Sequence, residues 1–411
     1  MNKPVYLYVT PFFPEPRRHF GSYCLDAVKA LVRDGRYDVR VFYPEHQTAD
    51  VEYTHGEYEI DGVKVYRFGI KRLPGLVFPF MFRRCNQRLF LKAVRQAGID
   101  VNSIAVCHGH TALFSIYPLA IKDVNARCLT LLHHHDLQSF GLNNSRFSHC
   151  WIYNLIEFPI LRWWHSQIDC HVFISEMVRK SFLSAPDASW SDYVEYRKQM
   201  QGLPYRPTRI KASYVLYNGV DAAIFNSGNQ AVVKRFDAFT IGCIGNFQSL
   251  KGHLTLLGAV RKIRSVGVEL HVRLVGRGPA LESCKDYVAQ NDLARVVSFE
   301  ESISHDKITE FYHSLDLFVL PSVFEGFGCV YTEAWACGTP FITTSGAGVV
   351  ELIPSEDRHL WVVKPHDVDD LVEKIMYYYQ HRDRQRLVGA VDIETLTARF
   401  LDKIDRFRLL K

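Results

Sequence analysis

The chain alternates short apolar runs with segments whose apolar residues recur at helical spacing. The apolar runs predict buried strands at residues 4–9, 39–43, 63–68, 104–106, 129–132, 171–175, 239–244, 317–320 and 340–344. The amphipathic segments predict helices at 23–32, 308–314, 329–337 and 393–410. Strands that alternate with helices form parallel sheets covered by helices. The pattern therefore predicts an α/β protein.

One βαβ unit, residues 317–351, carries the clearest chemistry. Its first strand leads into a turn, Glu325-Gly-Phe-Gly, that opens the next helix. Open α/β sheets bind ligands at the carboxyl ends of their strands, where glycines admit the ligand and a helix offers N–H groups. Two carboxylates, Glu325 and Glu333, flank the turn, and a carboxylate there suits hydroxyls better than phosphates. The unit predicts a ligand that has both phosphates and free hydroxyls, such as a nucleotide sugar.

The motif string resembles a known family. Pro-Ser-x-x-Glu-Gly-Phe-Gly, a second Glu eight positions on, Ala-x-Ala-x-Gly-x-Pro and a late Gly-x-x-Glu resemble the E-x7-E signature of retaining GT-B glycosyltransferases of the family 4 type, glycosyl transferases group 1. The resemblance implies two Rossmann-like, doubly wound parallel-sheet domains facing across a cleft. Residues 1–221 would form the acceptor side, residues 222–392 would bind the nucleotide sugar, and a helix at 393–411 would cross back onto the first domain.

The resemblance implies a diphosphate site in the second domain. Residues 245–252 resemble the family's G-R-x-x-x-x-K-G, where the Arg and Lys bind the donor diphosphate; Lys251 matches, whereas Asn246 replaces the Arg. We hypothesise that Arg277, in the next loop, partly restores the missing charge; the alternative is that it faces solvent from a turn. Lys251, Arg277 and the amides of 326–328 (Gly326, Phe327, Gly328) would stabilise the departing diphosphate. No cofactor beyond the nucleotide-sugar co-substrate is then expected, and no metal.

Carried over by position, Glu325 contacts the sugar hydroxyls of the donor and Glu333 its ribose hydroxyls. His135, after the strand at 129–132, matches the family's histidine near the donor sugar; the alternative is that it hydrogen-bonds loop backbone. Gly21 matches one of two glycines that face the donor phosphates and the acceptor, or serves only the strand-to-helix turn. The resemblance thus implies His135, Glu325 and Lys251 as the catalytic set.

Histidines gather at two predicted strand ends, 107–110 and 133–135. Imidazole is a common metal ligand. Neither cluster contains H-x-x-x-H or H-E-x-x-H, and neither has a carboxylate or thiol at helical spacing, so no metal site is predicted. The D-x-D spelling at 367–369 directly precedes a helical pattern, and it predicts a helix N-cap with an acidic first turn rather than a metal site.

Composition bears on the number of domains and on the cellular compartment. The 411 residues suffice for two full cores, and the values of 47% hydrophobic and 23% charged residues are ordinary for globular proteins. Ten scattered cysteines without a C-x-x-C pair indicate reduced thiols. No apolar run of 18 residues occurs, and the first strand begins where a signal peptide would lie. We expect a cytoplasmic protein, at the inner face of the membrane if the basic stretch described next binds lipid.

The positive charge lies in the first half of the chain. Residues 1–200 contain 24 Lys/Arg and 19 Asp/Glu, and the remainder contains 25 of each. Residues 62–99 contain nine basic residues and no acidic one, interleaved with apolar side chains. Such a stretch fits peripheral contact with an anionic membrane, or a solvated amphipathic helix whose apolar side joins the core. No nucleic-acid reader motif accompanies it.

These observations predict an enzyme that moves a hexose-type sugar from a nucleoside-diphosphate sugar to a glycan or lipid-linked acceptor. The resemblance implies a retaining, metal-independent transfer in polysaccharide or glycoconjugate assembly. Asn246 leaves open a catalytically weakened GT-B scaffold or binding subunit, and a phosphorylase or epimerase of the same fold is a further alternative. A dinucleotide oxidoreductase is not predicted, because no G-x-G-x-x-G follows the first strand.

Overall fold

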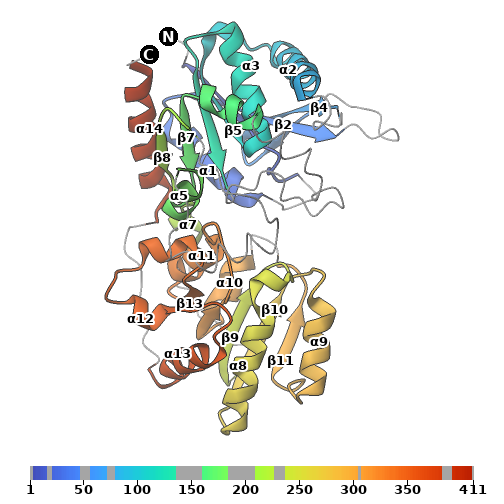
Figure 1. Cartoon of the computed structure of the whole chain (residues 1–411), viewed down its shortest axis with the longest axis vertical. Helices are drawn as coiled ribbons and strands as arrows, with labels where there is room; N and C mark the ends of the chain where they lie inside the picture. Colours follow the sequence, from blue (N-terminus) through green and yellow to red (C-terminus); the bar gives the residue numbers. More distant parts are fainter. Residues whose placement is uncertain are drawn as a thin grey trace. The chain divides into compact units, whose positions relative to one another are not determined.

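The computed structural model describes most of the chain as two compact units. The described residues are 3–15, 21–46, 56–71, 79–135, 160–183, 209–225, 237–303, 307–381 and 391–409. Unit 1 comprises Met1–Asn218 with Ile393–Lys411, and unit 2 comprises Gly219–Asp392 (Figure 1). The division thus follows Asn218, and the predicted boundary follows Asp221.

Unit 1 is built on an eight-stranded sheet of order β3-β4-β2-β1-β5-β6-β7-β8. Its strands are β1 (Val5–Val9), β2 (Asp38–His46), β3 (Glu57–Ile60), β4 (Val63–Ile70), β5 (Ile104–His110), β6 (Leu129–His134), β7 (Cys170–Phe173) and β8 (Ser213–Val215). All neighbouring strands pair in parallel except β3 with β4. Every residue of β1, β5 and β6 is buried, as expected for parallel strands covered on both faces.

The helices of unit 1 connect and cover these strands. They are α1 (Ser22–Asp34), α2 (Pro79–Gln96), α3 (Ile116–Val124), α5 (Glu176–Leu183) and α14 (Ile393–Leu409), with 3-10 turns η1 (Val101–Ser103) and η2 (Ala112–Ser115). The order of β2, β1, β5 and β6 reverses the winding direction between β1 and β5. The carboxyl ends of those two strands therefore form the topological switch point of the unit.

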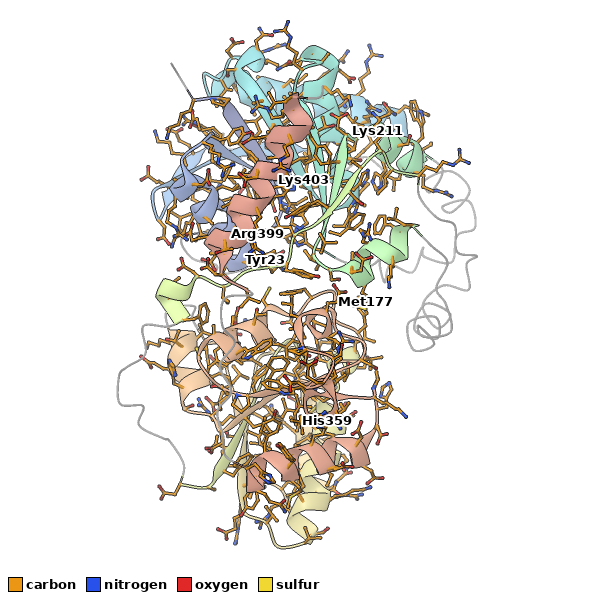
Figure 2. The ribbon with its side chains drawn as sticks, turned by 90° about the vertical axis from the view of Figure 1, so that its left-hand side faces the viewer. Tyr23, Met177, Lys211, His359, Arg399 and Lys403 are labelled. Atoms are coloured by element: carbon orange, nitrogen blue, oxygen red, sulfur yellow. The ribbon has the colours of Figure 1, made fainter. Side chains whose placement is uncertain are left out.

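The last helix, α14, belongs to unit 1, although it follows unit 2 in the sequence. Its residues Phe400, Leu401 and Ile404 share a core with α1 and β1. At the surface, Arg36 donates to Asp402 over 2.6 Å. Figure 2 shows α14 from the side that carries Arg399 and Lys403. Burial of these three apolar side chains accounts for the attachment of the helix, since exposed ion pairs contribute little.

Unit 2 contains a six-stranded parallel sheet of order β11-β10-β9-β12-β13-β14. Its strands are β9 (Phe239–Ile244), β10 (Leu270–Val275), β11 (Val297–Glu300), β12 (Leu317–Val319), β13 (Phe341–Thr344) and β14 (Val362–Val363). This is the 3-2-1-4-5-6 order of a Rossmann sheet, with its switch point between β9 and β12. The predicted fold class, with two Rossmann-like parallel-sheet domains, is confirmed.

The helices of unit 2 follow the same winding. They are α7 (Ala222–Phe225), α8 (His253–Ser265), α9 (Leu281–Gln290), α10 (Ile308–His313), α11 (Cys329–Ala336), α12 (Arg358–Trp361) and α13 (Val368–Gln380), with 3-10 turns η4 (Ser249–Lys251) and η6 (Gly348–Leu352). Helix α13 begins as predicted, because Asp367 accepts a hydrogen bond from the Asp370 amide at 3.0 Å. Within the described part of the chain, no helix combines the length and apolar character needed to span a bilayer.

Candidate active site

The switch point of unit 2 brings the predicted diphosphate residues to one place. Lys251 ends η4, directly before α8, and the loop that contains it follows β9. The loop after β12 returns to it through a main-chain hydrogen bond of 2.7 Å from Val323 to Leu250. Lys251 then donates from Nζ to Oε2 of Glu325, and both side chains are about one-fifth exposed (21% and 20%). Two residues from separate sequence motifs therefore form an ion pair beyond the carboxyl ends of β9 and β12.

The main chain around Glu325 is fixed by the loop after β13. Glu325 forms an isolated parallel bridge with Ala347, and the Gly348 amide donates to the Glu325 carbonyl at 3.0 Å. The Val349 amide likewise donates to the carbonyl of Phe327, whose side chain is buried. The ring of Phe327 therefore belongs to the core. Gly326 lies buried between these anchored residues.

Gly328 is the N-cap of α11, with φ +91°, a conformation that L side chains rarely adopt. A Cβ at this position would overlap the Tyr331 ring and lie 3.0 Å from Cγ of Glu325. The glycine thus lets the chain turn into α11 directly beside the ion pair. Amides of the first helical turn have no intrahelical acceptor, so this end of α11 suits an anion.

Glu333 lies in the second turn of α11 and contacts a buried tyrosine. The hydroxyl of Tyr312, on α10, donates to Oε2 of Glu333 at 2.7 Å. Burial, followed by the charge of Glu333, raises the pKa of Tyr312 well above its usual value, so the hydroxyl remains a donor at neutral pH. This hydrogen bond orients the carboxylate. The predicted ribose contact of Glu333 stays a prediction.

The loops that carry Asn246 and Arg277 pack on each other. The Phe247 amide donates to the Arg277 carbonyl at 3.0 Å, and the Ala280 amide donates to the Phe247 carbonyl at 2.8 Å. The guanidinium of Arg277 is exposed and donates from Nε to Ser302 Oγ at 3.2 Å. Asn246 is also exposed. The structure therefore places Arg277 in the loop next to Asn246, as the charge-replacement hypothesis requires, without testing that hypothesis.

The sequence motifs missed His253, which follows Gly252 at the start of α8. Its ring stacks on Phe247, with centroids 4.2 Å apart. Burial, and then the charge of Lys251, lowers the pKa of His253 to about 4, so the imidazole is neutral beside the lysine. The run Lys-Gly-His was the only signal in the sequence, and it did not reveal that Phe247 would bury the ring.

The remaining predicted site residues, Gly21 and His135, belong to unit 1. Gly21 caps α1 with φ +91°, and a Cβ there would lie 2.5 Å from the carbonyl carbon of Phe12. This close approach accounts for the glycine by the turn alone, and a ligand role remains a prediction. His135 follows β6 and shares a 2.8 Å hydrogen bond, Nε2 to Nδ1, with His110 on β5. Burial lowers the pKa of His135 to about 4.

The comparison with family models decides the assignment of unit 2. Residues 238–381, which run from β9 to the end of α13, match the family described as Glycosyl transferases group 1. Unit 2 is therefore similar to glycosyl transferases group 1. The matched region contains the Lys251–Glu325 pair, Arg277 and the start of α11. The predicted family is thereby confirmed.

Curated glycosyltransferases align with either part or nearly all of the chain. An uncharacterized glycosyltransferase of Methanocaldococcus jannaschii is 28% identical over 176 residues, which cover 43% of this chain and 46% of that protein. The chain thus spans less than half the length of this relative. A GDP-mannose-dependent α-(1-6)-phosphatidylinositol monomannoside mannosyltransferase of Mycobacterium tuberculosis is 26% identical, covering 96% of this chain and 94% of that protein.

Solved structures show the fold of the whole chain. Sucrose-phosphate synthase from Thermosynechococcus elongatus matches with a TM-score of 0.67 and 17% identity, and the match covers 100% of each chain. Anabaena HepE, solved in complex with UDP and glucose, matches with a TM-score of 0.64 and 15% identity, covering 98% of this chain and 99% of that one. The fold of the chain is GT-B.

Proposed function

We propose that this protein transfers a hexose from a nucleoside-diphosphate sugar to a glycan or lipid-linked acceptor. The observation that carries the proposal is the Lys251–Glu325 pair beside the α11 N-terminus, at the switch point of a Rossmann sheet. Lys251 supplies a cation that can bind a diphosphate, and Glu325 supplies a carboxylate that can accept hydrogen bonds from sugar hydroxyls. The names of two similar proteins support the ligand class, since one uses GDP-mannose and the other was solved with UDP and glucose.

The reaction we propose breaks the bond between the anomeric carbon and a diphosphate oxygen. The acceptor hydroxyl oxygen attacks the same face of the sugar, so the configuration is retained, and its proton passes to the departing diphosphate. Negative charge grows on the diphosphate as the bond breaks. Lys251, Arg277 and the amides of residues 326–328 would stabilise that charge, a role that a divalent ion fills in other enzymes. We therefore propose a metal-independent transfer.

The first test is a thermal-shift panel of UDP, GDP, ADP and CMP, without metal and then with magnesium. A ligand that binds the native protein raises its melting temperature by mass action. We expect one nucleoside diphosphate to stabilise the wild type by a few degrees without magnesium. Glu333→Ala and Lys251→Ala should abolish this shift, because they remove the proposed ribose and diphosphate contacts.

Two arginines supply a matched control for this panel. Arg277→Ala should reduce the shift more than Arg261→Ala does, since Arg261 is an exposed arginine that donates to the neutral Asn291 side chain at 3.3 Å. Equal shifts in these two variants would contradict a role for Arg277. Absence of any nucleotide shift would favour the scaffold or binding-subunit alternative, whereas turnover that requires inorganic phosphate would favour a phosphorylase.

For the acceptor side, we propose that unit 1 contacts an anionic membrane at the cytoplasmic face. The basic stretch at 62–99 includes α2, and its residues 72–78 lie outside the described part of the chain. Helix α2 buries Phe90 in the core, as a solvated amphipathic helix would. Its first turn nevertheless exposes Phe80 (59%) and Met81 (45%), and the Phe80 ring lies 6.3 Å from that of the exposed Trp163. Four exposed cations follow on the same helix: Arg84, Arg88, Lys92 and Arg95.

Vesicle co-sedimentation tests this contact. Binding to vesicles that contain phosphatidylglycerol should exceed binding to phosphatidylcholine alone, and it should fall as salt rises, because basic residues near an anionic surface each contribute about 1 kcal/mol. Phe80→Ser with Trp163→Ser should weaken binding several-fold. Val266→Ser is the control, since Val266 is an exposed apolar residue (73%) of unit 2. Equal losses in both proteins would contradict the assignment of the contact to α2.

A further inference from the structure

Three buried histidines meet at the carboxyl ends of β5 and β6. His108 and His110 are two residues apart on β5 and so share one face of the sheet. His133 of β6 is the parallel register partner of His110. Their exposed fractions are only 2%, 0% and 5%. The switch point of unit 1 therefore carries a compact group of imidazoles with almost no access to bulk water.

These histidines retain unpaired ring nitrogens. Nε2 of His108, Nε2 of His110 and both ring nitrogens of His133 have no hydrogen-bond partner among the described residues. The opposite nitrogens of the first two are paired: Nδ1 of His108 with the Tyr6 hydroxyl, and Nδ1 of His110 with Nε2 of His135, each at 2.8 Å. A buried polar atom without a partner costs free energy, so such groups usually mark a ligand, a water or an ion.

The spacing of the three rings fits a common ligand at their centre. One ring nitrogen from each histidine lies within 4.8 Å of the others. The ring centroids are separated by 4.6 Å (His108–His110), 4.8 Å (His110–His133) and 5.3 Å (His108–His133). Imidazoles on one tetrahedral zinc ion, with Zn–N near 2.0–2.1 Å, have centroids on the order of 5 Å apart. Binding of one ion requires the side chains to rotate, because the rings of His108 and His133 are parallel to within 4°.

We propose that His108, His110 and His133 bind one zinc ion or a similar divalent transition metal. Nitrogen ligands from three histidines suit zinc, which takes four ligands and needs no helical spacing. The pattern rules applied to the sequence require ligands one helical turn apart. Here two adjacent strands supply them instead, which is why the sequence predicted no metal site.

The charge state of the cluster agrees with this site. Burial is the first cause that lowers the pKa of His108, to about 3, and it lowers the pKa of His110 and His133 well below the usual value. All three imidazoles are therefore neutral at physiological pH, and a metal has no protons to displace. The neutral rings also do not repel a cation.

An overlapping group, Cys24 with His110 and His135, also has ligand atoms within 4.8 Å of one another. It is the weaker candidate. Nδ1 of His110 and Nε2 of His135 already bond each other. In the three-histidine group, each ring has at least one nitrogen without a partner among the described residues.

A metal at this site would position His135. Coordination through Nε2 of His110 leaves the ring proton on Nδ1, which then must donate to Nε2 of His135. The proton of the His135 ring is thereby placed on its Nδ1. This consequence rests on the proposed role of His135 at the donor sugar, whereas the metal site itself does not depend on the proposed function. It is also separate from the transfer step, for which we propose no metal.

Metal titration of the full chain tests the proposal. After EDTA treatment and desalting, we expect the wild type to bind one Zn²⁺ per chain in competition with a chromophoric chelator, and to melt at a higher temperature with Zn²⁺ than without. His133→Phe keeps an aromatic ring but removes the ligand nitrogens, and it should lose this equivalent. His359→Ala is the control, because His359 is an exposed histidine of unit 2 (Figure 2).

Two further measurements keep the proposal falsifiable. Circular dichroism establishes whether His133→Phe folds, and His108→Phe replaces it if it does not. In the wild type, Co²⁺ should give the intense visible bands of four-coordinate cobalt with nitrogen ligands. The proposal is wrong if wild type and a folded His133→Phe bind equal zinc, or if wild-type Co²⁺ shows only the weak spectrum of the hydrated ion. Neither readout depends on a nucleotide or on turnover.

Discussion

Replacing Lys251 by alanine is expected to lower sugar transfer by about 10²–10³-fold, the usual effect of removing one group that stabilises developing charge. Lys251 is the cation that matches the family motif in the loop after β9, and Asn246 supplies no second charge. Its ammonium contacts the Glu325 carboxylate in the free protein. A diphosphate would compete for the same ammonium, so the variant loses the cation just where the leaving group acquires charge.

Turnover of the donor that the nucleotide panel identifies measures this effect, together with the affinity for the nucleotide. Nucleotide affinity should fall by only about 10–100-fold, the value of one charge-assisted hydrogen bond, so turnover should suffer more than binding. Lys262→Ala is the matched control, because Lys262 pairs with a carboxylate of the same unit, Asp369, at 2.5 Å and at the surface. Loss of equal size in both variants would refute a specific role for Lys251.

The sequence located the turns that carry Lys251 and Glu325 because both turns follow strands that are buried on both faces. Continuous apolar runs located β9, β12 and β13, and the Rossmann order brings the carboxyl ends of β9 and β12 together. That topology explains why Lys251 and Glu325, 74 positions apart, form one ion pair. Each motif alone identified a residue type. Their contact followed from the sheet order that the family resemblance implied.

The sequence patterns could not predict contacts between side chains of neighbouring strands. The pairing of His110 with His133 depends on the register of β5 against β6, and a shift by one residue would turn His133 to the other face. The orientation of Glu333 likewise depends on Tyr312, from a helix 21 positions earlier. Periodicity places a side chain on one face of its own element, whereas such contacts join side chains of different elements.

A second histidine pair in unit 1 makes the protein sensitive to acid. His165 and His171 are fully buried, and the carbonyls of Ala112 and His165 respectively accept hydrogen bonds from their Nε2 atoms, at 3.0 and 2.9 Å. Burial lowers the pKa of His165 to about 4, and burial followed by the charge of His165 lowers the pKa of His171 to about 3. In the unfolded chain both should titrate near pH 6.5.

Between pH 6.5 and about 4, the unfolded chain therefore binds more protons than the native protein, and stability must fall as the pH falls. Each histidine contributes about 1.4 kcal/mol per pH unit, so the two together lower the free energy of unfolding by roughly 2–3 kcal/mol from pH 6 to pH 5. That is a large part of the 5–15 kcal/mol typical of a native protein.

Urea unfolding in EDTA at pH 7.5, 6.5 and 5.5 measures how steeply the free energy of unfolding depends on pH, before most carboxylates titrate. His165→Leu should make the slope shallower by about one proton, whereas His359→Ala, an exposed histidine, should leave it unchanged. Unfolding free energies that do not differ between pH 6.5 and 5.5 would show that these two imidazoles become protonated without unfolding, and that unit 1 admits water to them.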